Sequence, residues 1–293
     1  SNMKKNLHLF PRHDVFIFYR NITDKHPYRI TRKKRGKVKL IGINTPWHHY
    51  HGFEQEYLNP KVDSIFSKVL DDIRPDIVHI HHLIGLSSGI INIIRQRHLP
   101  IVITLHDYWY LCRRGQLITP DFQRCETIDF EVCKGCFIRQ DEPDKLTKIA
   151  SRWRHMIHSL DQSDLLISPS RYLRKVYIRN GIPAKKIIYS DNGIDKRPFR
   201  MQRKTRSNKT RFAFIGTFIE TKGLHVLIDA FKYLDRNKAT LQLFGSFPQA
   251  AQAYRRQILE MIEGYENIDI RGIFYPKDIS RIFKEIDCLV VPS

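Results

Sequence analysis

Short β-rich runs alternate with segments of helical periodicity along most of this 293-residue sequence. The alternation is typical of βαβ units, in which successive strands lie parallel and helices cover the sheet. The candidate strands are rich in Val, Ile, Leu or Phe, as buried parallel strands are. They are residues 38–43, 76–81, 101–105, 165–168, 187–190, 211–215, 241–244, 268–270 and 288–291. The pattern predicts an α/β fold built on parallel sheets.

One helical segment has a recognisable start, because Asn59 can cap a helix and Pro60 can occupy its first position. Apolar residues then recur on one face over residues 62–73, and the same period returns later in the chain. The later segments are residues 146–160, 226–234, 258–262 and 279–286. Apolar stripes of this kind pack into a core, so we assign them no functional role.

Composition excludes disorder for most of the chain, since 42% hydrophobic and 11% aromatic residues over this length are enough for two cores. Fifty Lys and Arg residues against thirty Asp and Glu give a formal net charge of +20. That excess favours an anionic partner such as nucleic acid, a phosphorylated ligand or an acidic membrane surface. No uncharged apolar run approaches the roughly 18 residues of a membrane span, and the start does not resemble a signal peptide. We therefore expect a cytoplasmic protein.

A basic segment without a strand or helix period divides the sequence. Residues 196–211 read KRPFRMQRKTRSNKTR, which predicts a linker. The expected organisation is a first domain over residues 1–195, a linker over 196–210 and a second domain over 211–293. A second basic stretch, residues 29–39, is expected to join two strands in a turn at Gly36.

The segment FAFIGTFIETKGLHVLIDAF combines a strand, a short loop and a helix. The strand ends at Gly216, and Lys222 and Gly223 open the helix. Backbone N–H groups and the positive end of the helix dipole face such a loop, and the lysine ammonium adds a full charge, so this geometry suits a phosphate. The spacing matches neither a P-loop nor the dinucleotide motif G-x-G-x-x-G. Two readings stay open: a phosphate site, or a solvated lysine beside a structural glycine.

Several segments, taken in order, resemble the motifs of the family 4 glycosyltransferases. They are PDIVHIHHLIGLSSG, ITLHDYW, SPSRYLRKVYIRNGIPAKKIIYSDNGID, FIGTFIETKG, LQLFGS, NIDIRGIF and IDCLVVPS. The resemblance extends over residues 54–293 and depends on the order and spacing of these segments rather than on one motif. It implies the GT-B arrangement, in which two Rossmann-like parallel-sheet domains face each other across a cleft. It also implies sugar transfer with retained anomeric configuration.

The resemblance further implies roles for individual residues. Lys222 matches the lysine that neutralises the donor diphosphate as the sugar leaves, and His106 matches the histidine of the first domain that faces the donor sugar. The other residues expected to approach the donor are Gly216, Thr217, Gly223, Gly245, Arg271, Gly272 and Ile273. Asn192, Gly193 and Asp195 match a turn near the hinge between the domains.

Three departures from the family's pattern bear on activity. The chain ends at Pro292 and Ser293, before the family's paired glutamates, one of which contacts the donor sugar. Residues 1–40 contain no counterpart of the family's early Gly-rich loop, and Thr217 stands where an arginine often assists the lysine. We therefore expect a chain truncated at both ends, with an incomplete second domain, that does not turn over alone.

Cys112, Cys125, Cys133 and Cys136 lie within 25 residues of one another. Cys133 and Cys136 have the two-residue spacing common in tetrahedral zinc sites, whereas twelve residues separate Cys112 from Cys125. The four are a candidate structural zinc site, and free or redox-active thiols or disulfides are the alternatives. Cys288 lies on a predicted buried strand and is expected to be a small core residue.

Histidines gather near predicted strands of the first domain. They are His48, His49, His51, His79, His81, His82 and His106. Strand alternation puts His79 and His81 on one face and His82 on the other. No carboxylate or cysteine stands at a spacing that would complete a metal site, so we expect these histidines to line a cleft. The aromatic neighbours of His106 fit either sugar stacking or core packing; they are Tyr108, Trp109 and Tyr110.

The predicted function is transfer of a sugar from a nucleotide-diphosphate sugar to a hydroxyl acceptor, in polysaccharide or glycolipid assembly, with no cofactor needed for catalysis. The expected partners are the nucleotide sugar, a sugar or lipid-linked sugar acceptor and an anionic membrane contacted peripherally at its inner face; nucleic acid is not expected. Two alternatives are a catalytically silent relative that serves as a partner protein, and a zinc-stapled nucleic-acid-binding protein. Basic residues scattered without a recognition helix count against the latter.

Overall fold

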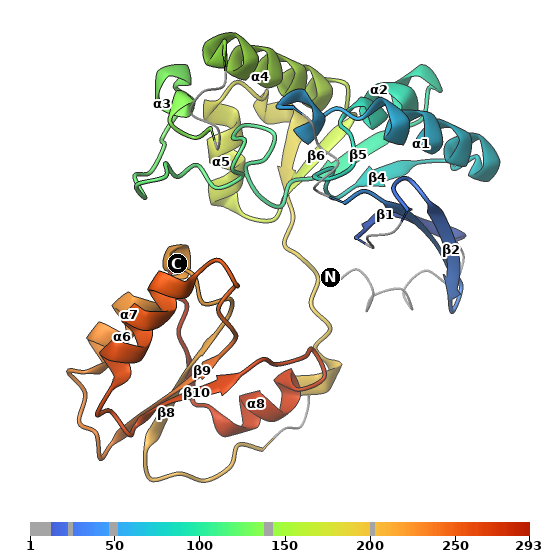
Figure 1. Cartoon of the computed structure of the whole chain (residues 1–293). Coiled ribbons are helices and arrows are strands. Elements are labelled where there is room, and N and C mark those ends of the chain that lie inside the picture. The colour runs from blue at the N-terminus through green and yellow to red at the C-terminus, as the bar shows by residue number, and fades with distance from the viewer. Residues whose placement is uncertain (1–12, 23–25, 47–51, 138–142, 200–202) are drawn as a thin grey trace. The chain divides into compact units, whose positions relative to one another are not determined.

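The computed structural model describes residues 13–22, 26–46, 52–137, 143–199 and 203–293. The chain divides into two compact units, residues 1–194 and 195–293. Each unit has its own sheets, helices and buried core (Figure 1). The predicted α/β class with parallel sheets in two domains is confirmed, as the sheets described below show.

The first unit begins with a three-stranded sheet in the order β1-β3-β2, made of β1 (Val15–Asn21), β2 (Ile30–Arg35) and β3 (Val38–Asn44). β1 is parallel to β3, whereas β2 is antiparallel to it. Gly36 has a φ of +58°, so the tight turn between β2 and β3 uses the left-handed region that glycine adopts without strain. The turn predicted at Gly36 is confirmed. β1 and β2 are additions to the predicted strands, and β2 is a basic, mostly exposed edge strand without an apolar pattern.

A second sheet of the first unit is wholly parallel, in the order β4-β5-β6-β7. Its strands are β4 (Val78–Ile80), β5 (Ile101–Thr104), β6 (Leu165–Ser168) and β7 (Ile187–Tyr189). Ile101, Ile103 and Leu166 have no exposed surface, as expected of strands that are covered on both faces. The parallel strands predicted in this part of the chain are confirmed.

The helices of the first unit are α1 (Pro60–Ile73), α2 (Gly89–Gln96), α3 (Phe130–Lys134), α4 (Lys145–Asp161) and α5 (Arg171–Arg179). Short 3₁₀ helices occur at Glu54–Glu56 and Ala184–Lys186. α1 starts as predicted: the side-chain oxygen of Asn59 accepts a hydrogen bond from the Val62 N–H at 3.3 Å, which satisfies one of the free amides of the first turn.

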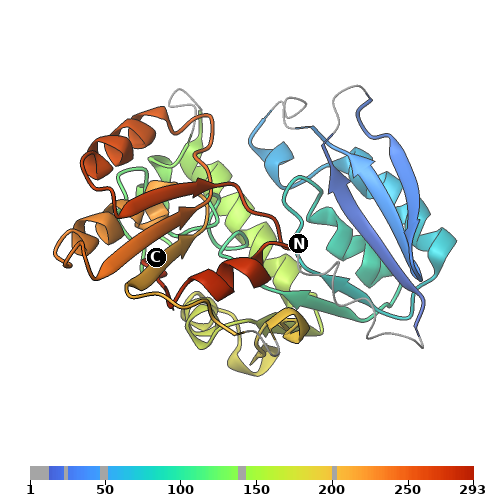
Figure 2. The ribbon, with the colours of Figure 1, turned by 90° about the horizontal axis from the view of Figure 1, so that it is seen from below.

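The second unit contains a four-stranded parallel sheet in the order β10-β9-β8-β11. Its strands are β8 (Thr210–Ile215), β9 (Ala239–Phe244), β10 (Ile268–Gly272) and β11 (Cys288–Leu289). The helices α6 (Leu224–Phe231) and α7 (Gln252–Ile262) share one buried cluster with the sheet, and α8 (Ile279–Glu285) packs on the other face through Ile282, Ala213 and Phe244 (Figure 2). A parallel sheet covered by helices on both faces is a Rossmann-like unit.

Cys288 is exposed, so the expectation of a core cysteine is wrong. β11 comprises only Cys288 and Leu289, and it pairs with β8 alone at the edge of the sheet. An edge strand this short has no neighbour on its outer side, and both of its side chains remain in contact with solvent.

The described part of the basic segment lies along the second unit. The Thr205 N–H donates to the Lys284 carbonyl oxygen at 3.0 Å, and the Lys204 ammonium donates to the Ile286 carbonyl oxygen at 2.6 Å. Arg197–Phe199 forms a short 3₁₀ helix. The basic residues therefore belong to the surface of this unit.

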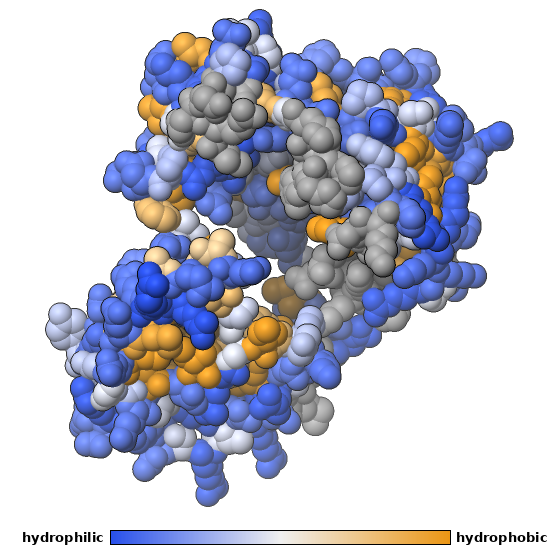
Figure 3. All heavy atoms as spheres, viewed as in Figure 1, coloured by the Kyte–Doolittle hydropathy of each residue, from blue (hydrophilic) through white to orange (hydrophobic). Residues whose placement is uncertain are grey.

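Hydrophilic side chains cover most of the face shown in Figure 3, in both units. This agrees with the formal net charge of +20. Within the described residues, no helix combines the length and the apolar character that crossing a membrane requires.

Candidate functional site

The carboxyl ends of β4 and β5 bring three of the predicted histidines together. The Nδ1 atom of His81 lies 2.9 Å from the Nε2 atom of His106, and the rings of His79 and His81 have centroids 4.3 Å apart. His79 is fixed in turn by a 2.8 Å hydrogen bond between its Nε2 atom and the Thr104 hydroxyl. Side chains at the carboxyl ends of neighbouring parallel strands meet at one edge of a sheet, and ligands of open α/β sheets bind at that edge.

These imidazoles are neutral at pH 7. Burial lowers the pKa of His81 to about 4, and repulsion from His79 and His106 in their protonated forms lowers it in the same direction. Burial likewise lowers the pKa of His79, and it lowers that of His106 against the opposing charge of Asp107. A group of neutral imidazoles can donate and accept hydrogen bonds but does not attract an anion by charge.

His82 and Asp107 form a separate pair. The Ile84 N–H donates to the Nδ1 atom of His82 at 2.9 Å, so the ring proton of His82 is on Nε2, 3.0 Å from Oδ2 of Asp107. Burial raises the pKa of Asp107, but the His82 hydrogen bond and charge and the hydrogen bond from the Trp109 N–H outweigh it, and the pKa falls below its usual value. Asp107 is therefore an ionised carboxylate with both oxygens occupied.

The loop that carries His106 is held by two buried side chains that sequence reasoning missed. Tyr177, on α5, donates from its hydroxyl to the carbonyl oxygen of Asp107 at 2.9 Å, and Arg152, on α4, donates to the carbonyl oxygen of Trp109 at 2.6 Å. Burial lowers the pKa of Arg152 to about 10, which still leaves it charged at neutral pH. An arginine inside the apolar stripe of a predicted helix was the available signal for such a role.

Two of the three aromatic neighbours of His106 belong to the core. Trp109 and Tyr110 are each 3% exposed, and their rings meet edge to face with centroids 5.2 Å apart. Core packing accounts for both. Residues His48, His49 and His51 lie outside the described part of the chain.

In the second unit, three predicted glycines meet at the carboxyl ends of β8, β9 and β10. The Gly245 N–H donates to the Gly272 carbonyl oxygen at 2.8 Å, and the Gly216 N–H donates to the Phe244 carbonyl oxygen at 2.9 Å. Gly245 has a φ of +153°, and a Cβ atom there would collide with the carbonyl oxygen of Gly216. The backbone approach at this edge therefore requires glycine at position 245.

Lys222 and Gly223 stand at the start of α6, as predicted. Gly223 is the N-cap, with a φ of +65°, and has no side chain that could cap the helix. The Tyr254 hydroxyl accepts a hydrogen bond from the His225 N–H of the first turn at 3.2 Å. Within the described residues, the exposed Lys222 ammonium has no hydrogen-bond or ion-pair partner. A Cβ atom on Gly223 would lie 3.0 Å from Cβ of Pro292, so the segment after β11 runs close beside this helix start.

The remaining predicted donor residues have less specific surroundings. Thr217 follows Gly216 and is exposed, and the side chain of Ile273 is 68% exposed. Arg271 forms an ion pair with Asp269 at 2.9 Å on the same strand. Its guanidinium is thus partly neutralised by β10 itself.

The zinc expectation is not supported: the described residues contain no group of three or more His, Cys, Asp or Glu side chains placed to hold a metal ion. Cys112, Cys125, Cys133 and Cys136 are all free thiols, without disulfides. Burial and the neighbouring thiols raise the pKa of Cys133 to about 12, and they raise those of Cys125 and Cys136 as well. Without a metal, these three thiols stay protonated at pH 7.

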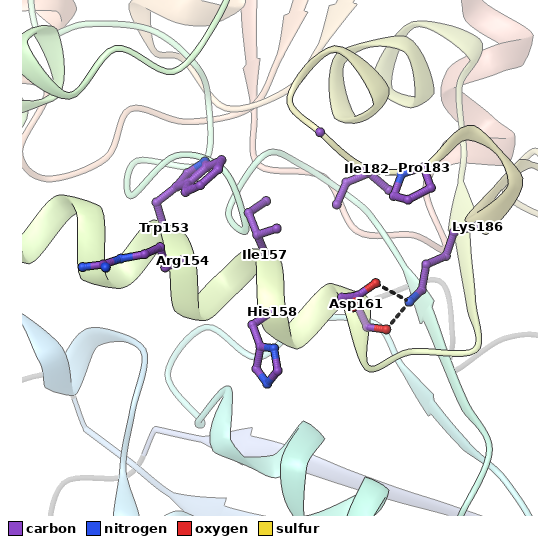
Figure 4. Close-up of a pocket in the computed structure, with 9 residues that line it drawn as sticks. Trp153, Arg154, Ile157, His158, Asp161, Ile182, Pro183 and Lys186 are labelled. Carbon is purple, nitrogen blue, oxygen red and sulfur yellow. Dashed lines mark hydrogen bonds and ion pairs between the residues drawn. The ribbon is translucent and has the colours of Figure 1, made fainter.

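A hollow of about 330 Å³ lies away from His79, His81 and His106 (Figure 4). Its walls come from the end of α4, including Trp153 and Ile157, and from the segment before β7, including Ile182. An ion pair between Asp161 and Lys186, 3.1 Å apart, stands at one end. Both walls precede β6 and β7, so the hollow is at the amino ends of the strands, opposite the edge where His106 lies.

Comparison with solved structures identifies the class of fold. The chain superposes on Anabaena HepE in complex with UDP with a TM-score of 0.59 at 16% identity, over 87% of this chain and 60% of that one. It superposes on E. coli trehalose-6-phosphate synthase bound with UDP-2-fluoro glucose with a TM-score of 0.63 at 14% identity, over 97% and 73% of the two chains. These likenesses show a fold of the GT-B type with two Rossmann-like domains.

Family models give the more particular assignment. Residues 8–197 match the model of Glycosyltransferase Family 4, and residues 209–293 match that of Glycosyl transferases group 1. The first model alone covers more than half of the sequence, so the chain belongs to Glycosyltransferase Family 4, as the sequence motifs predicted. No curated protein matches the chain. The chain spans 60% of the length of the HepE structure.

Proposed function

We propose that this protein transfers a glycosyl group from a uridine-diphosphate sugar to a hydroxyl acceptor, with retained anomeric configuration. One observation carries the proposal: a lysine without a partner among the described residues, Lys222, stands at the start of α6, on the sheet edge where Gly216, Gly245 and Gly272 meet. Family membership supports the reaction class. HepE and trehalose-6-phosphate synthase, whose structures hold UDP or a UDP-sugar, support the choice of uridine.

The chemistry follows from where negative charge develops. When the bond between the sugar and the diphosphate breaks, the leaving diphosphate gains charge. The ammonium of Lys222, the partial positive charge at the start of α6 and the first-turn N–H groups other than that of His225, which donates to Tyr254, would stabilise that charge. Groups fixed in advance around a leaving group lower the barrier by several kcal/mol, because they need not reorganise during the reaction. His106 would contact the sugar through hydrogen bonds to a hydroxyl.

Binding of UDP by the 293-residue chain tests the proposal directly. We expect isothermal titration to show UDP binding preferred over GDP and ADP, and Lys222→Ala to weaken it by about tenfold to a hundredfold, because a charge-assisted contact of about 1.5–3 kcal/mol is lost.

Lys238→Ala is the matched control, since Lys238 is an exposed lysine of the same unit whose ammonium lies 3.7 Å from Asp235. Its affinity for UDP should equal that of the wild type. Equal affinities of Lys222→Ala and the wild type, or no UDP binding at all, would refute the assignment.

The basic charge supports a further element of the proposal, an acceptor linked to lipid at an anionic membrane surface, as in polysaccharide or glycolipid assembly. Lys33, Lys34 and Arg35 form the exposed end of β2, and basic residues near anionic lipid contribute about 1 kcal/mol each. We expect vesicles containing phosphatidylserine to sediment the protein and vesicles of phosphatidylcholine alone to leave it in solution. Equal sedimentation by both would remove the membrane from the proposal.

A further inference from the structure

The ring of His106 is fixed by one neighbour. Its Nε2 atom lies 2.9 Å from Nδ1 of His81, and the two rings are stacked with centroids 5.2 Å apart and an interplanar angle of 21°. His81 is held from behind by His79, which is anchored on the Thr104 hydroxyl. Within the part of the chain that the structure describes, Nδ1 of His106 has no hydrogen-bond partner.

We propose that His81 is a positioning residue for His106: it occupies Nε2, fixes the plane of the ring and leaves Nδ1 as the ring nitrogen that meets a hydroxyl of the bound sugar. The identity of the ligand rests on the proposed function, whereas the contact between the rings stands without it.

Counting protons explains why a hydroxyl is the suitable ligand. A hydrogen bond between two imidazole nitrogens contains one proton, so a neutral pair has two arrangements. When His106 donates from Nε2, its Nδ1 atom accepts; when Nε2 accepts, Nδ1 carries the proton and donates. A hydroxyl both donates and accepts and therefore fits either arrangement. A phosphate or carboxylate oxygen only accepts and fits one.

The two other ionisable side chains described beside His106, Asp107 and His82, already have hydrogen-bond partners of their own. The carboxylate of Asp107 is the nearest candidate by sequence, but its Oδ2 atom accepts from His82 and its Oδ1 atom accepts from the Trp109 N–H at 2.8 Å. His82 is likewise committed, since its Nδ1 atom accepts from the Ile84 N–H. The ring of His106 thus depends on His81 for its orientation.

Two substitutions of His81 distinguish the hydrogen bond to His106 from the mere presence of a polar side chain at position 81. His81→Asn keeps an amide at the position of Nδ1, the atom that contacts His106, whereas His81→Gln places its amide one bond further out. His98→Asn is the matched control. His98 is exposed, and its φ of 56° is one that asparagine tolerates. Unfolding of each variant in urea shows that the fold is retained.

The first readout is the protonation of each ring nitrogen, measured by long-range ¹H–¹⁵N NMR of the histidine-labelled chain, with His106→Asn used for assignment. We expect the same protonation pattern for His106 in the wild type, His81→Asn and His98→Asn, and a changed ratio of the two tautomers in His81→Gln, which has lost the contact. A His106 ring that is the same in His81→Gln and the wild type would overturn the proposal.

The second readout is the affinity for UDP-glucose compared with that for UDP. Loss of one hydrogen bond to the sugar should weaken UDP-glucose binding by about fivefold to tenfold in His81→Gln and leave UDP binding unchanged. His81→Asn and His98→Asn should bind both as the wild type does. Equal UDP-glucose affinity in His81→Gln and the wild type contradicts the positioning role. A wild type that binds neither ligand refutes the proposed function, and the NMR comparison then decides the role of His81 by itself.

Discussion

At the scale of single residues, the candidate site residues of the two units differ in charge. The histidines on the edge of the first unit are neutral, and the carboxylate of Asp107 among them is fully hydrogen bonded. The second unit presents an ammonium, that of Lys222, with no partner within its described surroundings. Neutral imidazoles suit the hydroxyls of a sugar, and an ammonium suits a diphosphate.

Acid should destabilise the first unit through its histidines. The pKa of His81 is lowered from 6.5 to about 4 by burial and its neighbours, and those of His79 and His106 move in the same direction. The unfolded chain therefore binds protons that the folded chain does not. The stability that these neutral rings provide is complete above about pH 6.5 and is lost as the pH falls towards about 4.

Urea unfolding measured between these pH values tests this expectation. The free energy of unfolding should fall with pH in the wild type and in His98→Asn, and it should fall less steeply in His81→Asn, which has no ring to protonate. The other ionisable groups at this edge are His82 and Asp107. The lowered pKa of Asp107 places its own loss of stability at more acidic pH. Identical slopes in His81→Asn and the wild type would contradict the attribution to His81.

At the scale of elements, α4 supports the loop after β5. Arg152 is a buried residue of this helix whose guanidinium bonds the Trp109 carbonyl oxygen and faces the rings of Tyr57 and Trp109 at 5.7 and 5.6 Å. A buried arginine can stabilise a fold only when its donors and its charge are matched in this way.

Arg152→Met should therefore lower the free energy of unfolding by about 1–3 kcal/mol, because it leaves a buried carbonyl oxygen without its donor. Urea titration followed by tryptophan fluorescence measures the change. Arg154→Met is the control, since Arg154 is an exposed residue of the same helix and its loss should cost less than about 0.5 kcal/mol. If Arg152→Met were as stable as the wild type, the free-energy cost of burying the guanidinium would equal the stabilisation from its contacts.

The sequence patterns located the elements whose residues face a core. The runs behind β3 to β10 and the stripes behind α1, α4, α6, α7 and α8 are apolar because each contributes residues to a buried core. The run behind β11 is apolar although its two strand residues are exposed. β2 was expected only as the strand before the turn at Gly36 and was given no bounds, because an exposed edge strand has no reason to be apolar. α3 is too short to display a helical period, and α2 and α5 were not singled out from their surroundings.

The candidate site was predictable to the extent that it depends on strand ends. His81 and His106 were placed near an edge because His81 ends one predicted strand and His106 follows another, and Lys222 because it follows a strand and a loop. The contacts of Arg152 and Tyr177 could not be foreseen, since each reaches the loop from a helix far along the chain and only the tertiary fold brings them together.

At the scale of the whole molecule, each of the two units has its own buried core. Residues 190–196 form no helix or strand and are almost all exposed, and the boundary between the units falls at Ile194 and Asp195. A connection of this kind is a preferred site of proteolysis.

Limited trypsin digestion should therefore cut first after Lys196. The expected result is two fragments, one for each unit, identified by intact mass, because the other exposed basic residues of the described chain are mostly in helices, strands or hydrogen-bonded turns. Earlier cleavage within a helix or strand of either unit would show that this segment is not the most accessible part of the chain.

Gly245 leaves no room for even a methyl group beside the carbonyl oxygen of Gly216. A larger residue would have to spread the ends of β8 and β9, and the hydrogen bond from the Gly216 N–H to the Phe244 carbonyl oxygen would be strained. The spacing between Gly216 and Gly245, which follow β8 and β9, is thus set by main-chain atoms alone. Neighbouring side chains are consequently free to diverge, and under the proposed function such changes would alter which nucleotide is selected without changing the spacing of the two strand ends.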